Sequence, residues 1–187
     1  VHGEMGRHDD AAREFEEAIE LTGGRYGDDH PTILDYRDNL ARAYEQLGRV
    51  EDAEAIYEDN LARRVHVHGE DHPETAKARL ARATLWDRMG RHDDAIAELE
   101  RAAAIFERHL GPDHSRTATA LNNIGFAYVR QERYEQAVPA LEDALARFER
   151  SLGPDHPETA NPRHSLARCA FYLGHSDVAA ASFEWPR

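Results

Sequence analysis

A motif that recurs every 42 residues limits the fold of this 187-residue chain more than any other feature. It is a Gly-x-Asp-His link, whose Asp-His pairs occupy positions 29/30, 71/72, 113/114 and 155/156. A second phase carries a small residue throughout, at Ala11, Ala53, Ala95, Ala137 and Ala179. A short period kept without insertions is typical of a stacked repeat protein, in which each unit buries its apolar face against its neighbours.

Each unit contains the pattern of two helices. Segments 74–90 and 91–110 are rich in Ala, Leu, Glu and Arg and lack internal proline, which favours helix. In the second segment, apolar residues recur at the i, i+4, i+7 spacing of one helix face, and period two is absent throughout the chain. Between the helices, a tight turn is expected at Gly6, Gly48, Gly90 and Gly174, with Glu132 in the fourth slot.

The sequence therefore predicts an all-α fold, a right-handed α-solenoid (superhelix) of stacked antiparallel helical hairpins with about nine helices. We expect one domain over residues 1–187. Its units are a partial first unit 1–27, then 28–69, 70–111, 112–153 and a last unit 154–187. In the partial unit, a second helix is expected from about residue 8 to residue 21.

Two segments, 39–61 and 123–145, carry a resemblance to a known family. The first has the large, small, aromatic, Gly, Ala, aromatic order of that family at Leu40, Ala41, Tyr44, Gly48, Ala53 and Tyr57. The chain thus resembles the tetratricopeptide repeat family, in the 42-residue form of kinesin light chains, whose units are joined by a Gly-x-Asp-His-Pro link. The resemblance covers essentially the whole chain and implies a protein-binding superhelix with a concave groove.

The Asp-His pairs suggest acid-base chemistry, but four copies one repeat apart cannot converge on one cleft. We interpret the aspartates as helix N-caps, with a glutamate three residues later completing a capping box in two units. Asp29, Asp71, Asp113 and Asp155 should then each accept a backbone hydrogen bond, while His30, His72, His114 and His156 have no assigned role. Pro162 predicts that the first helix of the last repeat unit starts late or kinks. Asn60, where other units have Ala, predicts weaker local packing.

Composition narrows the function. A net charge of −13 argues against nucleic-acid binding, which depends on Lys and Arg. No apolar run is long enough to span a membrane, and the single Cys169 cannot form an internal disulfide, so a cytoplasmic location is expected. The chain starts at Val1 without an initiator Met, which suggests a piece of a longer protein.

No motif for catalysis or for a cofactor is present. The segment 66–72 holds three histidines and two acids, but no second ligand cluster supports a metal site, so we read it as a solvated linker. Cys169 occupies a small-residue position and is expected to be a buried packing thiol. We therefore predict a protein that is not an enzyme and needs no metal or cofactor.

In the family that the chain resembles, the inner face of the first helices lines the peptide groove. Transferred phase by phase, that face contains four acids and five Lys or Arg, so it is near neutral in a strongly negative chain. Asn39 and Asn123 occupy the slot where family members often hold the backbone of a peptide, although Ala81 interrupts this series. The residues expected to bind a peptide are Asn39, Arg42, Arg88, Asn122, Asn123, Phe126, Arg130 and Arg168. An alternative is that these are ordinary solvated polar residues.

Three functions remain open from the sequence. The first is a non-catalytic scaffold that binds a peptide segment, apolar and acidic, of a partner protein. The second is a sensor or oligomerisation arm of a larger regulator, such as a bacterial signalling NTPase. The third is self-association through exposed solenoid ends.

Overall fold

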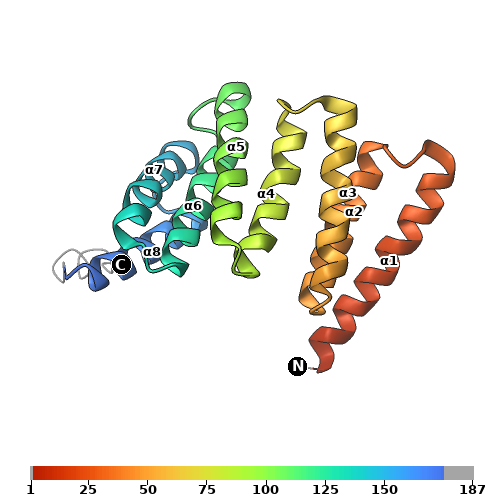
Figure 1. The fold of residues 1–187 in the computed structure, drawn as a ribbon, viewed down its shortest axis with the longest axis horizontal. Coiled ribbons are helices and arrows are strands. Elements are labelled where there is room, and N and C mark those ends of the chain that lie inside the picture. Colours follow the sequence, from red (N-terminus) through yellow and green to blue (C-terminus); the bar gives the residue numbers. More distant parts are fainter. Residues whose placement is uncertain (1, 175–187) are drawn as a thin grey trace. The chain divides into compact units, whose positions relative to one another are not determined.

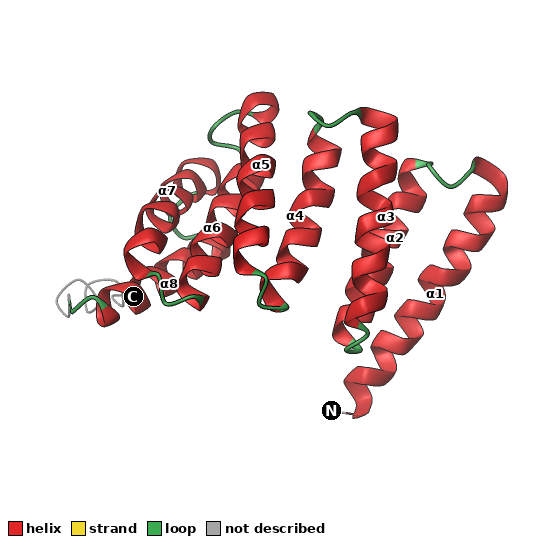
Figure 2. Ribbon diagram, in the orientation of Figure 1, coloured by secondary structure: helices red, strands yellow, loops and turns green. Residues whose placement is uncertain are grey.

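The computed structural model describes residues 2–174, with side chains from residue 7 onward (Figure 1). Over these residues it has eight α-helices, one short 3-10 helix and no strand, which confirms the all-α prediction (Figure 2). The ninth expected helix falls on residues 175–187, outside the described part. The chain divides into two compact units, unit 1 (Val1–Leu85) and unit 2 (Trp86–Arg187). A single domain over the whole chain stays a prediction.

Unit 1 contains α1 (His2–Tyr26), α2 (Pro31–Gln46), α3 (Val50–His68) and most of α4 (Pro73–Arg88). Helix α2 packs against both α1 and α3. Their shared core includes Tyr44 and Tyr57, and Ala53 is fully buried, as the register of small residues requires for close helix approach. Helix α1 differs from the prediction, because it runs unbroken through Gly6 from residue 2 and does not start near residue 8.

Unit 2 contains α5 (His92–Leu110), α6 (Ser115–Arg130), α7 (Tyr134–Leu152), the 3-10 helix η1 (Pro157–Thr159) and α8 (Ala160–Tyr172). Helix α6 packs against α5 and α7, and α7 packs against α8. Cys169 is buried beside Leu141 and Ala137, and burial raises the pKa of its thiol. The prediction of a buried packing thiol is therefore confirmed.

The turns between paired helices share one construction. Gly48 and Gly90 adopt positive φ values of 75° and 82°, where a side chain is disfavoured. The next residue in each turn is an arginine, whose backbone N-H closes the helix end and whose guanidinium covers the aromatic ring five residues earlier. Arg49 lies 3.7 Å from the Tyr44 ring centroid and donates its backbone N-H to the Tyr44 carbonyl at 2.9 Å. Glu132 takes the glycine slot of the third such turn at φ 58°.

The links between successive repeats correct the prediction that the aspartates are the helix N-caps. The N-cap of α2 is His30, whose Nδ1 accepts the backbone N-H of Thr32 at 3.3 Å. The same bond, to the residue two positions on, recurs at 3.2 Å for His72, 3.1 Å for His114 and 3.2 Å for His156. The histidine and not the aspartate is thus the cap, which gives the recurring histidine its role. The aspartates of two links instead pair with arginines of the following second helix, Asp29 with Arg63 and Asp113 with Arg150.

A threonine completes three of the four links. The hydroxyl of Thr75 donates to the carbonyl of Gly69 at 2.7 Å, and Thr117 donates to the equivalent Gly111 at 3.3 Å. Thr159 instead donates to the carbonyl of Pro154, one residue after the link glycine, at 3.1 Å. In the last link, the first turn is the 3-10 helix η1, and α8 begins at residue 160, three residues later than the register of α2 and α4. Pro162 has no N-H for the α-helical bond of that turn, so the predicted late start is confirmed.

Candidate functional site

The residues predicted to bind a peptide divide between the two units, so each set is described by itself. We call the predicted inner face the first-helix face; it comprises these residues and their neighbours on the same side of the first helices, including its four acids Asp35, Asp38, Glu45 and Asp87. In unit 1, Asn39 is half-buried on α2 and Arg42 is exposed one turn later, with its guanidinium 3.4 Å from the Asn39 side-chain oxygen. In unit 2, Asn122, Asn123, Phe126 and Arg130 follow one another on α6, with Arg88 exposed at the end of α4 and Arg168 exposed on α8.

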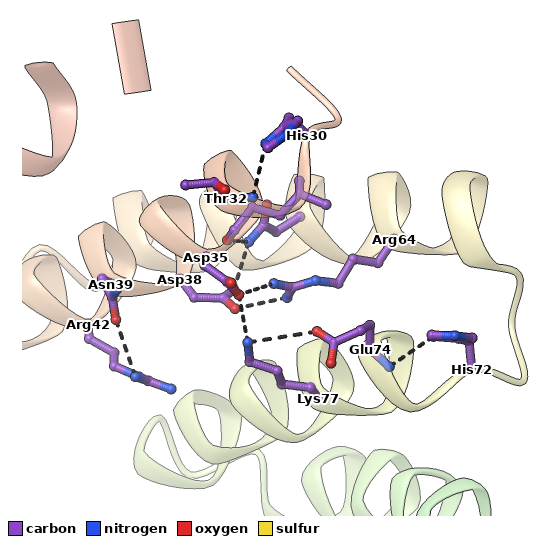
Figure 3. Close-up of polar contacts among 12 residues, drawn as sticks. His30, Thr32, Asp35, Asp38, Asn39, Arg42, Arg64, His72, Glu74 and Lys77 are labelled. Carbon is purple, nitrogen blue, oxygen red and sulfur yellow. Dashed lines mark hydrogen bonds and ion pairs between the residues drawn. The ribbon is translucent and has the colours of Figure 1, made fainter. Parts of the chain in front are cut away.

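The unit 1 face rests on a buried polar network (Figure 3). Arg64 from α3 reaches Asp38 on α2 at 2.9 Å, and both side chains are almost fully buried, at 2 % and 4 % exposure. Arg64 also contacts Asp35 at 3.2 Å, and Lys77 from α4 binds the same Asp35 oxygen at 2.6 Å (Figure 3). Lys77 also lies 3.8 Å from Glu74, so the network joins two cations to three carboxylates and ties α2 to α3 and α4.

Asn60 completes this network from α3. It is fully buried, and its amide nitrogen donates to the Leu34 carbonyl and to Asp38, each at 2.7 Å. Hydrogen bonds therefore hold Asn60, where the sequence suggested looser packing. Its amide oxygen has no hydrogen-bond partner in the described structure. The sequence contains a feature that could have predicted this network. Positions 38, 60 and 64 are polar, whereas the equivalent positions of the next repeat are the apolar Leu80, Ala102 and Phe106.

The unit 2 face contains a second buried carboxylate, Asp87, at the end of α4. Its Oδ2 lies 3.2 Å from Nε of Arg130 on α6, and its Oδ1 lies 2.7 Å from Nδ1 of His92 on α5. Sequence reasoning placed Asp87 and Arg130 on the same face but did not pair them. It missed His92, which lies on a second helix.

Aromatic rings border the same unit at α8. Tyr172 stacks on Tyr134 with centroids 4.8 Å apart, and Phe171 meets the Tyr172 ring edge-on at 5.3 Å. Phe171 and Tyr172 are exposed, and the Arg168 guanidinium lies 5.9 Å from the Tyr172 ring centroid. This surface joins a cation to large apolar area, a combination suited to an amphipathic ligand.

Asn122 lies at the centre of the α6 face but is 7 % exposed, so the structure gives it a more buried position than a peptide-contacting residue needs. Its amide oxygen is buried without a hydrogen-bond partner in the described structure. Asn123 and Phe126, which are half-buried, present more of their side chains to solvent. The accessible predicted residues of α6 are therefore Asn123, Phe126 and Arg130.

Two arginines of the first-helix face differ from most others in the chain. Arg42 in unit 1 and Arg168 in unit 2 are exposed and have no carboxylate partner among the described residues, as is also true of Arg25 on α1. By contrast, Arg63, Arg147 and Arg150 each pair with an acid of a neighbouring element. The face thus offers unneutralised positive charge in a chain whose net charge is −13.

Acid-base groups near this face serve structure. Tyr57 donates its hydroxyl to Glu45 at 2.7 Å, and burial, with this hydrogen bond, raises its pKa far above the ordinary value. Across residues 2–174, no three His, Cys, Asp or Glu side chains are arranged to hold a metal ion. Over the same residues, no helix combines the length and apolar character that crossing a membrane requires.

Comparison with known proteins gives a consistent family. The tetratricopeptide repeat family matches four overlapping segments, residues 1–64, 36–108, 83–150 and 116–185. No curated protein matches the chain significantly.

Several solved structures share the fold. The nearly identical TPR-like repeats of a kinesin light chain protein from Podosopora anserina are 24 % identical, covering 96 % of this chain and 84 % of that chain, with a TM-score of 0.78. BtubC (BKLC) from P. vanneervenii is 22 % identical over 97 % of this chain and 72 % of its own, with a TM-score of 0.83. A Rap protein in complex with Competence and Sporulation Factor is 14 % identical, with a TM-score of 0.79; this chain is covered to 97 %, and the Rap protein to 48 %.

Proposed function

Because the chain belongs to the tetratricopeptide repeat family, we propose that it is a non-catalytic scaffold that binds a peptide segment of a partner protein along its first-helix face. Repeats of this family commonly act as protein-interaction scaffolds, and their fold is generally non-enzymatic. The Rap protein that shares the fold was solved in complex with Competence and Sporulation Factor. These relationships support the class of function, and the residues argue for the ligand.

The observation that carries the proposal is the unneutralised arginine on each unit's first-helix face. A long cationic side chain on the surface can be solvated by water and needs no carboxylate partner. Such a cation is available to bind a ligand. In a chain with 36 acids and 23 Lys or Arg, most cations should have an acid near them. That Arg42 and Arg168 have none among the residues that the structure describes favours an anionic partner at this face.

The neighbouring side chains specify the rest of the ligand. Phe126 on α6 and the exposed Phe171 on α8 offer apolar contact, and Asn123 offers an amide to a peptide backbone. The bound segment should therefore alternate acidic with large apolar residues. The chain's overall negative charge does not prevent this, since salt screens charges beyond about 8 Å at physiological ionic strength and only nearby arginines act on the bound segment.

Charge reversal tests the proposal. The wild type should bind peptides on an array that varies the number and position of Glu and Phe. The double variant Arg130→Glu, Arg168→Glu should not bind them. The matched control is Arg150→Glu, because Arg150 is as exposed as Arg130, at 52 % against 48 %, but lies on α7 and pairs with Asp113. Binding that survives the double reversal, or is lost equally in the control, would refute this face as the site.

We also propose a cytoplasmic location, on the grounds of the charged composition and the single cysteine. A buried thiol away from any second cysteine needs no oxidising compartment.

A further inference from the structure

We propose that Asp87, braced by His92, is a positioning residue that fixes the Arg130 guanidinium so that its terminal Nη edge faces a carboxylate of the bound segment. The binding part of this inference rests on the proposed function, whereas the positioning part can be measured without any ligand. All three residues belong to unit 2.

Asp87 is a nearly buried carboxylate with both oxygens engaged. Its side chain is 11 % exposed, with Arg130 at Oδ2 and His92 at Oδ1. An ionised carboxylate can only accept hydrogen bonds, so His92 carries its proton on Nδ1 in this contact. Two helices thus hold one carboxylate in place, which leaves Asp87 little freedom to follow a mobile arginine.

The turn between α4 and α5 builds this arrangement. Gly90, at φ 82°, donates its N-H to the Asp87 carbonyl at 3.1 Å, and Arg91 donates to the Trp86 carbonyl at 2.9 Å. The chain reverses so that His92, the first residue of α5, meets Asp87. The carboxylate also lies near the N-terminal end of α5, where the helix dipole favours negative charge.

Neither of the other two turns between paired helices in the described part of the chain can make the same contact. The equivalents of Asp87 and His92 are Glu45 and Val50 in the preceding turn, and Val129 and Tyr134 in the following one. Glu45 instead accepts the Tyr57 hydroxyl. The Asp-His pair is therefore specific to the repeat whose neighbour contributes Arg130.

The contact with Asp87 leaves the two Nη groups of Arg130 available to a ligand. The ion pair between Nε and Asp87 is the only polar contact that Arg130 makes within the described residues, and the side chain is 48 % exposed. A guanidinium binds a carboxylate best through two parallel N-H groups, and the Nη pair can still do so when Nε is occupied. Holding the fork in place beforehand lowers the entropy lost on binding. Phe126, one turn earlier on α6, places apolar contact next to that carboxylate.

A positioning role and a simple charge effect predict opposite effects of Asp87→Asn on the affinity for an acidic peptide. Asp87 cancels one positive charge at the face, so on charge alone Asp87→Asn should strengthen binding of an acidic peptide. A positioning role predicts that the same change weakens binding. Asp93 is next to His92 on α5 and pairs with Arg133 at 3.0 Å. Asp93→Asn is therefore a matched control that removes the same charge one residue from His92 without touching Arg130.

The first experiment uses the free protein. In a ¹⁵N NMR spectrum of the arginine Nε-H groups, Arg130 should give a signal with slow solvent exchange and restricted motion. His92→Leu should lose that signal, and His92→Asn, which keeps a donor near Nδ1, should largely restore it. A mobile Arg130 Nε-H in the wild type, or one that His92→Leu leaves unchanged while the variant stays folded by circular dichroism, would overturn the positioning role whether or not any peptide binds.

The second experiment uses a short fluorescein-labelled peptide of alternating Glu and Phe residues, with a Gln-for-Glu peptide as its counterpart. Asp87→Asn should weaken binding of the acidic peptide by about two- to tenfold, the effect of having to immobilise one flexible side chain. Asp93→Asn should leave it unchanged or slightly stronger, and Asp87→Asn should have no effect in an Arg130→Ala background. Tighter binding by Asp87→Asn would overturn the inference. Equal binding of the two peptides by the wild type would instead refute the proposed acidic ligand and leave the NMR result standing.

Discussion

Replacing Asp38 by Leu would leave the Arg64 guanidinium buried in unit 1 without its nearest partner. The two groups are 2.9 Å apart and almost fully buried. At an effective dielectric constant of about 20, charges at this distance attract by about 6 kcal/mol, which offsets desolvation penalties of several kcal/mol per ion. The intact pair is thus close to neutral for stability, but a single deletion removes the attraction and keeps the penalty.

The expected cost of Asp38→Leu is about 3 kcal/mol, at the lower end of the usual range for breaking a buried pair. The lower end applies because Asp35 remains 3.2 Å from Arg64 and is itself half-exposed to water. A loss of this size is a large part of the total stability of a domain, which is about 5 to 15 kcal/mol. Urea unfolding followed by circular dichroism measures it directly.

The chain supplies its own compensating variant. The next repeat has Leu80, Ala102 and Phe106 at the positions of Asp38, Asn60 and Arg64. The triple variant Asp38→Leu, Asn60→Ala, Arg64→Phe should therefore recover the loss and exceed wild-type stability by up to about 3 kcal/mol. If Asp38→Leu costs less than about 1 kcal/mol, or if the triple variant is as unstable as the single one, the reasoning about a buried and balanced pair is wrong.

Three further changes test local features of the fold. Glu132→Gly should stabilise the protein by about 0.5 to 1 kcal/mol, because Glu132 has φ 58° and only glycine adopts that region without strain. The control Glu135→Gly, in the first turn of α7, should destabilise the protein by about as much. Thermal unfolding of the two variants measures both changes. His114→Ala should cost about 0.5 to 1 kcal/mol through loss of the helix cap, whereas His114→Asn should keep most of that stability; a larger loss in Asp113→Ala than in His114→Ala would restore the aspartate as the cap. Because burial raises the pKa of the Cys169 thiol, less thiolate is present at a given pH, and alkylation by iodoacetamide at pH 8 should be at least about tenfold slower than for free cysteine; rapid alkylation of the folded protein, followed by mass spectrometry, would contradict its burial.

The helices were predictable because periodicity and turn residues act locally. Gly48 and Gly90 end first helices where the sequence placed turns, and Pro162 delays α8 for the reason that proline always does. The capping residue was not predicted correctly, since aspartate is a far commoner N-cap than histidine. Only the backbone path shows that the histidine occupies the cap position, while the preceding aspartates Asp29 and Asp113 pair with arginines.

The candidate site was predictable as a face but not as a set of contacts. Register alone places Asn39 and Arg42 on α2 and Phe126 and Arg130 on α6, because residues three or four apart share a helix face. Pairing between helices has no such rule. The partnership of Asp87 with His92 and Arg130 depends on how three helices meet, and Arg64 was not recognised as a core residue because a lone arginine is usually exposed.

The central claim is that the first-helix face of unit 2 holds an acidic and apolar peptide. An NMR titration of the isotopically labelled protein with the Glu-Phe peptide tests this claim most directly. The account predicts that the largest shift changes occur at Asn123, Phe126, Arg130 and Arg168, with much smaller changes on the outer surface of α5 and α7. Changes concentrated on those second helices, or saturable binding that leaves the α6 and α8 signals in place, would contradict it.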